Sequence, residues 1–325
     1  MMDKLNGVNC ESTLSITGVV RERSSKNPNQ ATGDIEVVPT DIVVLGKCRH
    51  NELPFEINRS KEADENARLK YRYLDLRRPD LQEKIMNQNE QKILVANTAI
   101  DTLIKEGKIF SGMKIGLGTG STAMPAVKRL AEHLEKGTIK DVKAVVTSFQ
   151  TANACQEWGI PVYSLNDKII DGQLDLAIDG ADEVDPNCNC IKGGGAALLQ
   201  EKMVEYNSKI FVVIADSSKS VQTIGTGFRV PVEIIGAARI PVVKALNALG
   251  ADCVLREGVK KCGPVITDNG NQILDCLWQN PIDVPKMEEE INKIVGVVEN
   301  GLFTKNKPIV FIAKEDGSVE QRNWH

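Results

Sequence analysis

The sequence lacks the features of a membrane protein or a secreted protein. Its 325 residues contain no apolar run long enough to span a bilayer, and the opening stretch MMDKLNGVNCEST has no apolar signal-peptide core. The eight cysteines are scattered, and none belongs to a C-x-x-C pair. This scatter in a long chain argues against a disulfide framework. We therefore expect a cytoplasmic protein with reduced thiols and no membrane partner.

Histidine is scarce, and a strong positive charge is absent. The three histidines, His50, His133 and His325, offer no ligand spacing, and Cys188 and Cys190 form the only close pair of thiols. We therefore expect no metal site. The formal net charge of -4 argues against an electrostatic grip of the whole protein on nucleic acid.

Between residues 81 and 229, apolar runs alternate with helical patterns. The runs MKIGLG, VKAVVT, LDLAID and IFVVIA are typical of strands buried on both faces of a parallel sheet. Between them, stretches such as TAMPAVKRLAEHLEKG and AALLQEKMVEYN have apolar residues at helical spacing. This alternation predicts an α/β domain with a doubly wound, Rossmann-like parallel sheet.

The segments before residue 81 and after residue 229 have different patterns of predicted strands and helices. Residues 230–304 read as strand, helix, strand, hairpin and helix, with the hairpin turn at Asn269-Gly270, and predict a smaller ferredoxin-like α+β domain. We expect a strand within residues 305–325 to return to one of the two sheets. Residues 1–80 predict short strands, with alternation at residues 35–44 broken by Pro39, and then a charged linker or exposed helix.

The stretch KIGLGTGSTA places glycines between a predicted strand and a predicted helix. Glycines let a backbone approach an anion, and the helix start offers free N–H groups. The stretch is not a P-loop, because no Gly-Lys-Ser/Thr follows, and Ser121 and Thr122 stand where a dinucleotide fingerprint needs its third glycine. A site for a phosphate monoester remains, with a tight turn capped by Ser121 as the structural alternative.

Charged residues follow the next strands of the predicted sheet. Asp179 and Asp182 come at the end of LDLAI, where open α/β sheets bind ligands, although Asp-Gly turns are also common on surfaces. Lys192 opens a triple-glycine loop, and Glu201 lies in the helix after it. A lone helical glutamate is usually solvated, but its nearness to Lys192 and two aspartates favours a site. Lys219 follows another strand and could bind an anion.

Taken together, GTGSTA, DGADEVD, KGGGAALLQEKM, ADSSK, PVE and VITDNGN resemble ribose-5-phosphate isomerases of type A, in order and in spacing, over residues 88–325. The resemblance implies interconversion of D-ribose 5-phosphate and D-ribulose 5-phosphate through an enediolate, in the non-oxidative pentose phosphate pathway. It implies no metal, no organic cofactor and a homo-oligomer. It makes Glu201 the general base, Asp179 an acid/base for ring opening and Lys192 a charge for the enediolate oxygen. The substrate-binding residues that it implies are Thr119, Gly120, Ser121, Thr122, Asp179, Gly180, Ala181, Asp182, Lys192, Gly193, Gly194, Gly195, Lys219 and Lys92.

The first eighty residues resemble a different family. TGVVRERSSKNPNQATGDIEVV and ARLKYRYLDLRRP are similar to the later strands of the anticodon-binding OB-fold, and to the linker after it, in bacterial-type aspartyl-tRNA synthetase. The barrel's opening strands and the catalytic motifs are missing. We therefore expect a partial OB-fold-like segment fused to an isomerase, without synthetase activity.

Two other functions stay open at this point. The same scaffold could serve another sugar-phosphate or acyl-CoA enzyme, although six motifs in order favour the isomerase. The basic cluster of Arg68, Lys70, Arg72, Arg77 and Arg78 would suit an RNA-binding module. A truncated barrel exposes strand edges rather than a binding surface, so we expect no nucleic-acid partner.

Overall fold

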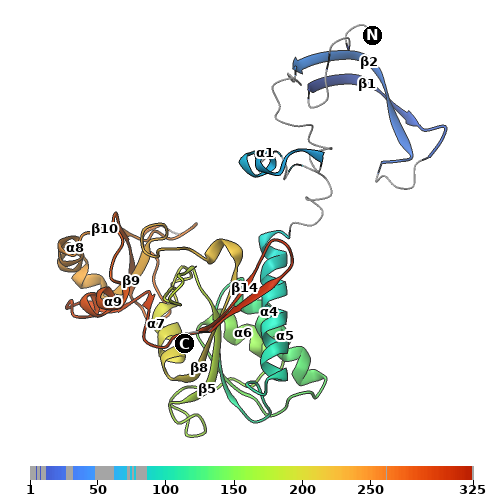
Figure 1. The fold of residues 1–325 in the computed structure, drawn as a ribbon. Coiled ribbons are helices and arrows are strands. Elements are labelled where there is room, and N and C mark those ends of the chain that lie inside the picture. The colour runs from blue at the N-terminus through green and yellow to red at the C-terminus, as the bar shows by residue number, and fades with distance from the viewer. Residues whose placement is uncertain are drawn as a thin grey trace. The chain divides into compact units, whose positions relative to one another are not determined.

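The computed structural model describes residues 12–26, 32–47, 62–71 and 86–323, apart from Lys261, together with isolated positions at 5, 8, 74 and 77. The chain divides into two compact units, Met1–Glu83 and Lys84–His325 (Figure 1). In the described part of the chain, no helix is long and apolar enough to cross a membrane.

The first unit contains an antiparallel strand pair, β1 (Thr13–Glu22) with β2 (Ile35–Gly46), and a short helix α1 (Glu65–Lys70). The expected break at Pro39 is wrong, because β2 runs through it. Pro39 pairs with Gly18 beside a register shift, the kind of place where a strand tolerates proline. A Cβ at Gly18 would lie 2.3 Å from the Val38 carbonyl oxygen, so glycine permits this close pairing. Arg72 and Arg78 of the basic cluster lie outside the described residues.

A six-stranded sheet forms the centre of the second unit. Its strand order is β15-β14-β8-β5-β3-β4, and every neighbouring pair is parallel except β14 with β15. The predicted α/β sheet is therefore present, with one antiparallel strand at its edge. The chain leaves β3 toward one edge and leaves β5 toward the other, so their carboxyl ends flank a switch in direction. The bounds are β3 Lys114–Leu117, β4 Lys143–Val146, β5 Leu174–Gly180, β8 Ser208–Asp216, β14 Ile309–Ala313 and β15 Val319–Arg322.

Two apolar cores lie on the two faces of this sheet, because strand side chains alternate between faces. One core contains Leu176 and Ile178 of β5 together with α4 (Gln88–Lys105) and α5 (Ala123–Glu135), and it includes Cys155 of α6 (Phe149–Glu157). The other core contains Ala177 and packs against α7 (Leu198–Tyr206) through Val204. Figure 1 shows α4 and α5 on the side of the sheet away from α7.

A second, four-stranded antiparallel sheet has the order β10-β11-β9-β12. Its elements follow one another as β-α-β-β-α-β, the order of ferredoxin-like folds. The expected hairpin within residues 263–278 is wrong in its first arm, which supplies only isolated bridges, although Asn269 and Gly270 do form a turn. The bounds are β9 Val230–Ile234, α8 Arg239–Ala248, β10 Ala251–Leu255, β11 Gln272–Trp278, α9 Val284–Asn292 and β12 Val297–Asn300.

Three short strands form a third sheet, two from the segment between β5 and β8 and one that follows β12. β6 (Glu183–Val184), β7 (Cys190–Ile191) and β13 (Leu302–Phe303) form a small sheet in the order β13-β7-β6. After β13 the chain returns to the large sheet, where β14 pairs in parallel with β8. The α7 helix is thereby held between the large sheet and the residues of the second sheet (Figure 1).

Candidate active site

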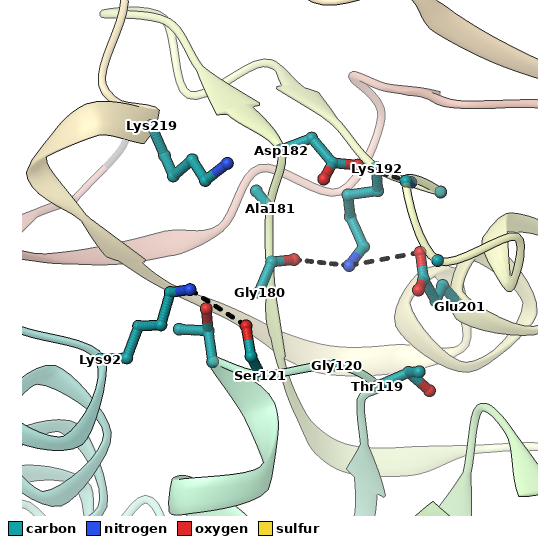
Figure 2. Close-up of a pocket in the computed structure, with 14 residues that line it drawn as sticks. Lys92, Thr119, Gly120, Ser121, Gly180, Ala181, Asp182, Lys192, Glu201 and Lys219 are labelled. Carbon is teal, nitrogen blue, oxygen red and sulfur yellow. Dashed lines mark hydrogen bonds and ion pairs between the residues drawn. The ribbon is translucent and has the colours of Figure 1, made fainter. Parts of the chain in front are cut away.

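A cavity of about 270 Å³ opens where β3 and β5 end, at the direction switch of the large sheet. Figure 2 shows side chains from α4, from the loops after β3 and β5, from the glycine loop before α7, from α7 and from the 3-10 turn η4 (Ser217–Lys219). The cavity brings together every sequence-predicted site residue except Asp179. Its lining is Lys92, Thr119, Gly120, Ser121, Thr122, Gly180, Ala181, Asp182, Lys192, Gly193, Gly194, Gly195, Glu201 and Lys219.

Asp179 is buried beside the lining, and the first glycine loop is built around it. A Cβ at Gly118 would lie 1.8 Å from the Asp179 Oδ1, so only glycine allows this approach. The Asp179 Oδ1 accepts hydrogen bonds from the backbone N–H of Thr119 at 3.0 Å and of Gly180 at 2.7 Å. The carboxylate therefore joins the ends of β3 and β5.

The rest of this loop lines the cavity and leads into helix α5. Thr122 holds the N-cap position of α5 without a side-chain cap, so the proposed cap by Ser121 is wrong. The Ser121 hydroxyl instead accepts a hydrogen bond from the Lys92 Nζ at 3.1 Å. Figure 2 shows Lys92 and Lys219 at one end of the cavity, and Lys192 with Glu201 at the other. The first end offers two cations and a helix start, which together suit an anion.

The Lys192 ammonium is buried among carboxyl groups at the opposite end. It donates to the Asp179 Oδ2 at 2.7 Å and to the Gly180 carbonyl oxygen at 2.6 Å. Two more carboxyl oxygens lie near its Nζ, Glu205 Oε1 at 3.2 Å and Glu201 Oε2 at 3.5 Å. These acids offset the cost of burying the ammonium, and they raise the pKa of Lys192 well above its usual range against the opposing effect of burial. Lys192 therefore stays charged.

Glu201 has the ionisation of a general base. Burial raises the pKa of its carboxyl to about 7, and the negative charges of Asp179 and Asp182 act in the same direction. The Lys192 ammonium opposes this rise. A base with a pKa near neutrality can accept a proton and give it back with little free-energy loss in either direction. Glu201 lines the cavity, so this proton exchange can involve a bound molecule.

The triple-glycine loop is held from two directions. The Asp182 Oδ2 accepts a hydrogen bond from the Gly194 N–H at 2.7 Å, and a Cβ at Gly194 would lie 2.5 Å from the other Asp182 oxygen. From the second sheet, the Arg256 guanidinium donates to the Gly193 and Gly194 carbonyl oxygens at 3.0 and 3.1 Å. Arg256 is itself held by both carboxylate oxygens of Asp275. The loop therefore has a defined shape before any ligand binds.

Sequence reasoning missed two residues of this site, Glu205 and Arg256. Glu205 follows Glu201 by four positions, which places both on one helix face, and that face also buries Leu198 and Val204. The sequence pattern that could have pointed to Glu205 is a second acidic residue on an otherwise apolar helix face. Arg256 lies more than sixty residues after the glycine loop, and no spacing in the sequence relates the two.

Comparisons with known proteins show the family to which the chain belongs. The family model for ribose 5-phosphate isomerase A (phosphoriboisomerase A) matches residues 143–317. A ribose-5-phosphate isomerase A from Treponema denticola is 62% identical over 237 residues, which cover 72% of this chain and 99% of that protein. The chain belongs to the ribose-5-phosphate isomerase A family.

Other members of the ribose-5-phosphate isomerase A family are also similar to this chain. The protein of that name from Thermosynechococcus vestitus is 45% identical over 72% of this chain and 95% of its own length. A solved D-ribose-5-phosphate isomerase in complex with phospho-erythronic acid has a TM-score of 0.68 and 42% identity, and covers 73% of this chain and 99% of its own. These relatives are matched almost in full, while more than a quarter of this chain lies outside each match. The resemblance of the first eighty residues to aspartyl-tRNA synthetase stays a prediction.

Proposed function

We propose that the chain interconverts D-ribose 5-phosphate and D-ribulose 5-phosphate as an aldose-ketose isomerase. The observation that carries this is a pair of groups at one end of the cavity: a buried carboxyl with a pKa of about 7 and a buried ammonium 3.5 Å away from it. An isomerase must take a proton from C2 of the aldose and return it to C1. Glu201 is the group placed for that transfer, and Lys192 offsets the charge of the enediolate between the two steps.

The other end of the cavity is the proposed phosphate site. Lys92 and Lys219 supply positive charge there, and Ser121 supplies a hydroxyl that already bonds Lys92. The N–H groups of Ser121 and Thr122 lie at the start of helix α5, whose N-terminus adds a favourable dipole, while the N–H groups of Thr119 and Gly120 donate to Asp179 and Gln150. A sugar phosphate bound across the cavity would then place its phosphate among these groups and its carbonyl end near Glu201.

Asp179 and Asp182 have different places in this proposal. Asp182 lines the cavity and is suited to hold sugar hydroxyls, and its bond from Gly194 couples that task to the shape of the glycine loop. Asp179 is proposed as the acid/base of ring opening, although it does not line the cavity. Its Oδ2 is 2.7 Å from the Lys192 Nζ, so its carboxylate would take the proton of the ring hydroxyl through Lys192: the amine receives that proton as it passes one to Asp179, and the ammonium stays charged.

The test is an assay of the purified protein with ribose 5-phosphate, followed by formation of the ketose, with and without a chelator. We expect turnover that a chelator leaves unchanged. Glu201→Gln should lower kcat by roughly 100-fold or more, the usual scale for a general base, and should stop exchange of the C2 proton with solvent. A wild-type protein without isomerase activity, or a variant with unchanged turnover and exchange, would contradict the proposal.

Several finer points belong to the same proposal. We interpret the strand order of the large sheet as doubly wound and Rossmann-like, with residues 81–229 as one domain to which the strand in 305–325 returns, and residues 230–304 as a smaller domain. We infer a homo-oligomer in the cytoplasm from the resemblance, with no metal or cofactor. Residues 1–80 are proposed to be a fused OB-fold-like segment without an RNA ligand.

A further inference from the structure

One buried acid in the cluster has no role in the reaction proposed above. Three carboxyl groups surround the Lys192 ammonium, and all three are buried: Asp179 is 1% exposed, Glu201 4% and Glu205 0%. The distances to the Nζ are 2.7, 3.5 and 3.2 Å. One positive charge cannot balance three negative ones on side chains this deeply buried, so at least one acid must be neutral.

Hydrogen-bond donors distinguish the three acids. Asp179 accepts from two backbone N–H groups and from Lys192, which favours its ionised form. Glu201 lines the cavity, so its charge can be solvated there or used by a ligand. Glu205 has neither advantage: it does not line the cavity, and neither of its oxygens accepts a hydrogen bond from any residue that the structure describes. An ionised Glu205 would have only the ion pair with Lys192.

The carboxyl groups of Glu205 and Asp179 lie against the same ammonium, with Asp179 Oδ2 at 2.7 Å and Glu205 Oε1 at 3.2 Å from the Lys192 Nζ. Two buried carboxyl groups that crowd one ammonium repel each other when both are ionised, and a proton on one of them removes this repulsion. We propose that Glu205 is a positioning residue that holds a proton at neutral pH and donates it to the Asp179 carboxylate, so that the charge of Lys192 stays available to the reacting sugar. Its effect on turnover rests on the proposed isomerase function.

The charge of the cluster explains why this matters for an enediolate. With Glu205 neutral, Asp179 and Lys192 cancel, and Glu201 supplies the single negative charge. When Glu201 takes the C2 proton, the cluster becomes neutral at the step that places a negative charge on the sugar. If Glu205 were ionised, the cluster would keep a negative charge at that step and would oppose the enediolate.

The groups that face Glu205 support this assignment. Burial is the main cause that raises the pKa of Glu205 well above its usual range, and the charges of Asp179 and Glu201 add to it. Lys192 opposes them. The thiol of Cys190 on β7 also interacts with Glu205, and burial raises its pKa, so it remains an uncharged neighbour.

Infrared spectroscopy tests the protonation state without any assay of activity. A difference spectrum between the wild type and Glu205→Gln at pH 7 should contain the C=O stretch of a protonated carboxylic acid. Glu157→Gln, at the exposed end of α6, is the matched control and should remove carboxylate bands instead. Carboxylate bands in the Glu205 difference spectrum would overturn the proposal, whether or not the protein is an isomerase.

Kinetics test the positioning role. Glu205→Leu should lower kcat by about 10-fold, because Asp179 loses a donor and the Lys192 ammonium is no longer held in place. Glu205→Gln, which mimics the neutral acid, should restore most of that loss and keep the acid limb of the pH profile where the wild type has it. An ionised Glu205 predicts the opposite: its removal would lower the pKa of Glu201 and shift that limb to lower pH. A shift of about half a pH unit or more in Glu205→Gln would therefore refute the assignment.

Discussion

Glu201→Gln should make the protein more stable at alkaline pH while it removes activity. The folded protein raises the pKa of Glu201 from 4.5 to about 7, so between these values the folded state binds more protons than the unfolded state. Stability from this group is therefore present below about pH 4.5 and is lost as the pH rises through 7. A shift of that size corresponds to about 3 kcal/mol of unfolding free energy. Glutamine resembles the protonated acid and does not suffer this loss.

The assay is denaturant unfolding of both proteins at pH 5 and at pH 8.5. The variant should exceed the wild type by about 3 kcal/mol at pH 8.5 and by less than about 1 kcal/mol at pH 5. Over the same range, wild-type kcat/KM should rise with pH to a plateau above about pH 7, because the ionised carboxyl is the base. Glu157→Gln is the exposed control and should show no such difference. Equal gains at both pH values would refute the reasoning, since the effect would then not arise from ionisation.

Three further predictions concern binding, the loop and the join between the two units. Lys219→Ala and Lys92→Ala should each raise KM by about 10-fold with a smaller change in kcat, because a phosphate is bound alike in the ground and transition states; loss confined to kcat would place these lysines at the reacting carbons instead. Arg256→Lys should lower kcat/KM by about 10-fold, because a lysine cannot bind both carboxylate oxygens of Asp275 and also reach the carbonyl oxygens of the glycine loop. Unchanged kinetics would show that the glycine loop keeps its shape without Arg256. A chain that starts at residue 81 should keep the activity and thermal stability of the whole protein, and failure of this shortened chain to fold would contradict the prediction. The whole protein should bind aspartate tRNA no better than an unrelated tRNA, and any binding should be lost as the salt concentration increases. A preference for aspartate tRNA that persists at high salt would contradict this.

Most of the cavity could be predicted from the sequence, because its parts are local. A strand that ends in glycines, or in DGAD, carries its own signal for a turn at a sheet's carboxyl edge, and parallel strands bring such turns together. Residues as far apart as Lys92 and Lys219 therefore meet without any long-range information beyond strand order.

The predictions that were wrong concern residues whose structure depends on tertiary contacts rather than on the local sequence pattern. Pro39 lies within a strand because the partner strand places Gly18 opposite it. Residues 263–268 were expected to pair with β11 as the first arm of a hairpin, but they form no regular strand. The edge of β11 on which they would pair is occupied by β10, and the residues between β10 and β11 form a loop. Ser121 bonds Lys92 rather than capping α5, a choice that depends on the position of another helix. No window of sequence contains these partners.

Two buried lysines at α7, Lys192 and Lys202, have different surroundings. Lys202 Nζ is fully engaged: it contacts the carboxylates of Glu288 and Glu299 and the carbonyl oxygens of Asn300 and Leu302. These fixed partners join α7 to α9, β12 and β13 and give the ammonium an acceptor in every direction in which it can donate.

The Lys192 cluster, to which α7 supplies Glu201 and Glu205, is different. It leaves one oxygen of Glu201 and both oxygens of Glu205 without a hydrogen-bond donor among the described residues. Such unpaired buried groups cost folding free energy, and native proteins keep few of them without a functional reason. Glu201 and Lys202 are neighbours in the sequence and both are buried, yet Lys202 joins α7 to the second sheet, whereas Glu201 belongs to the cluster in which we propose that a substrate exchanges a proton.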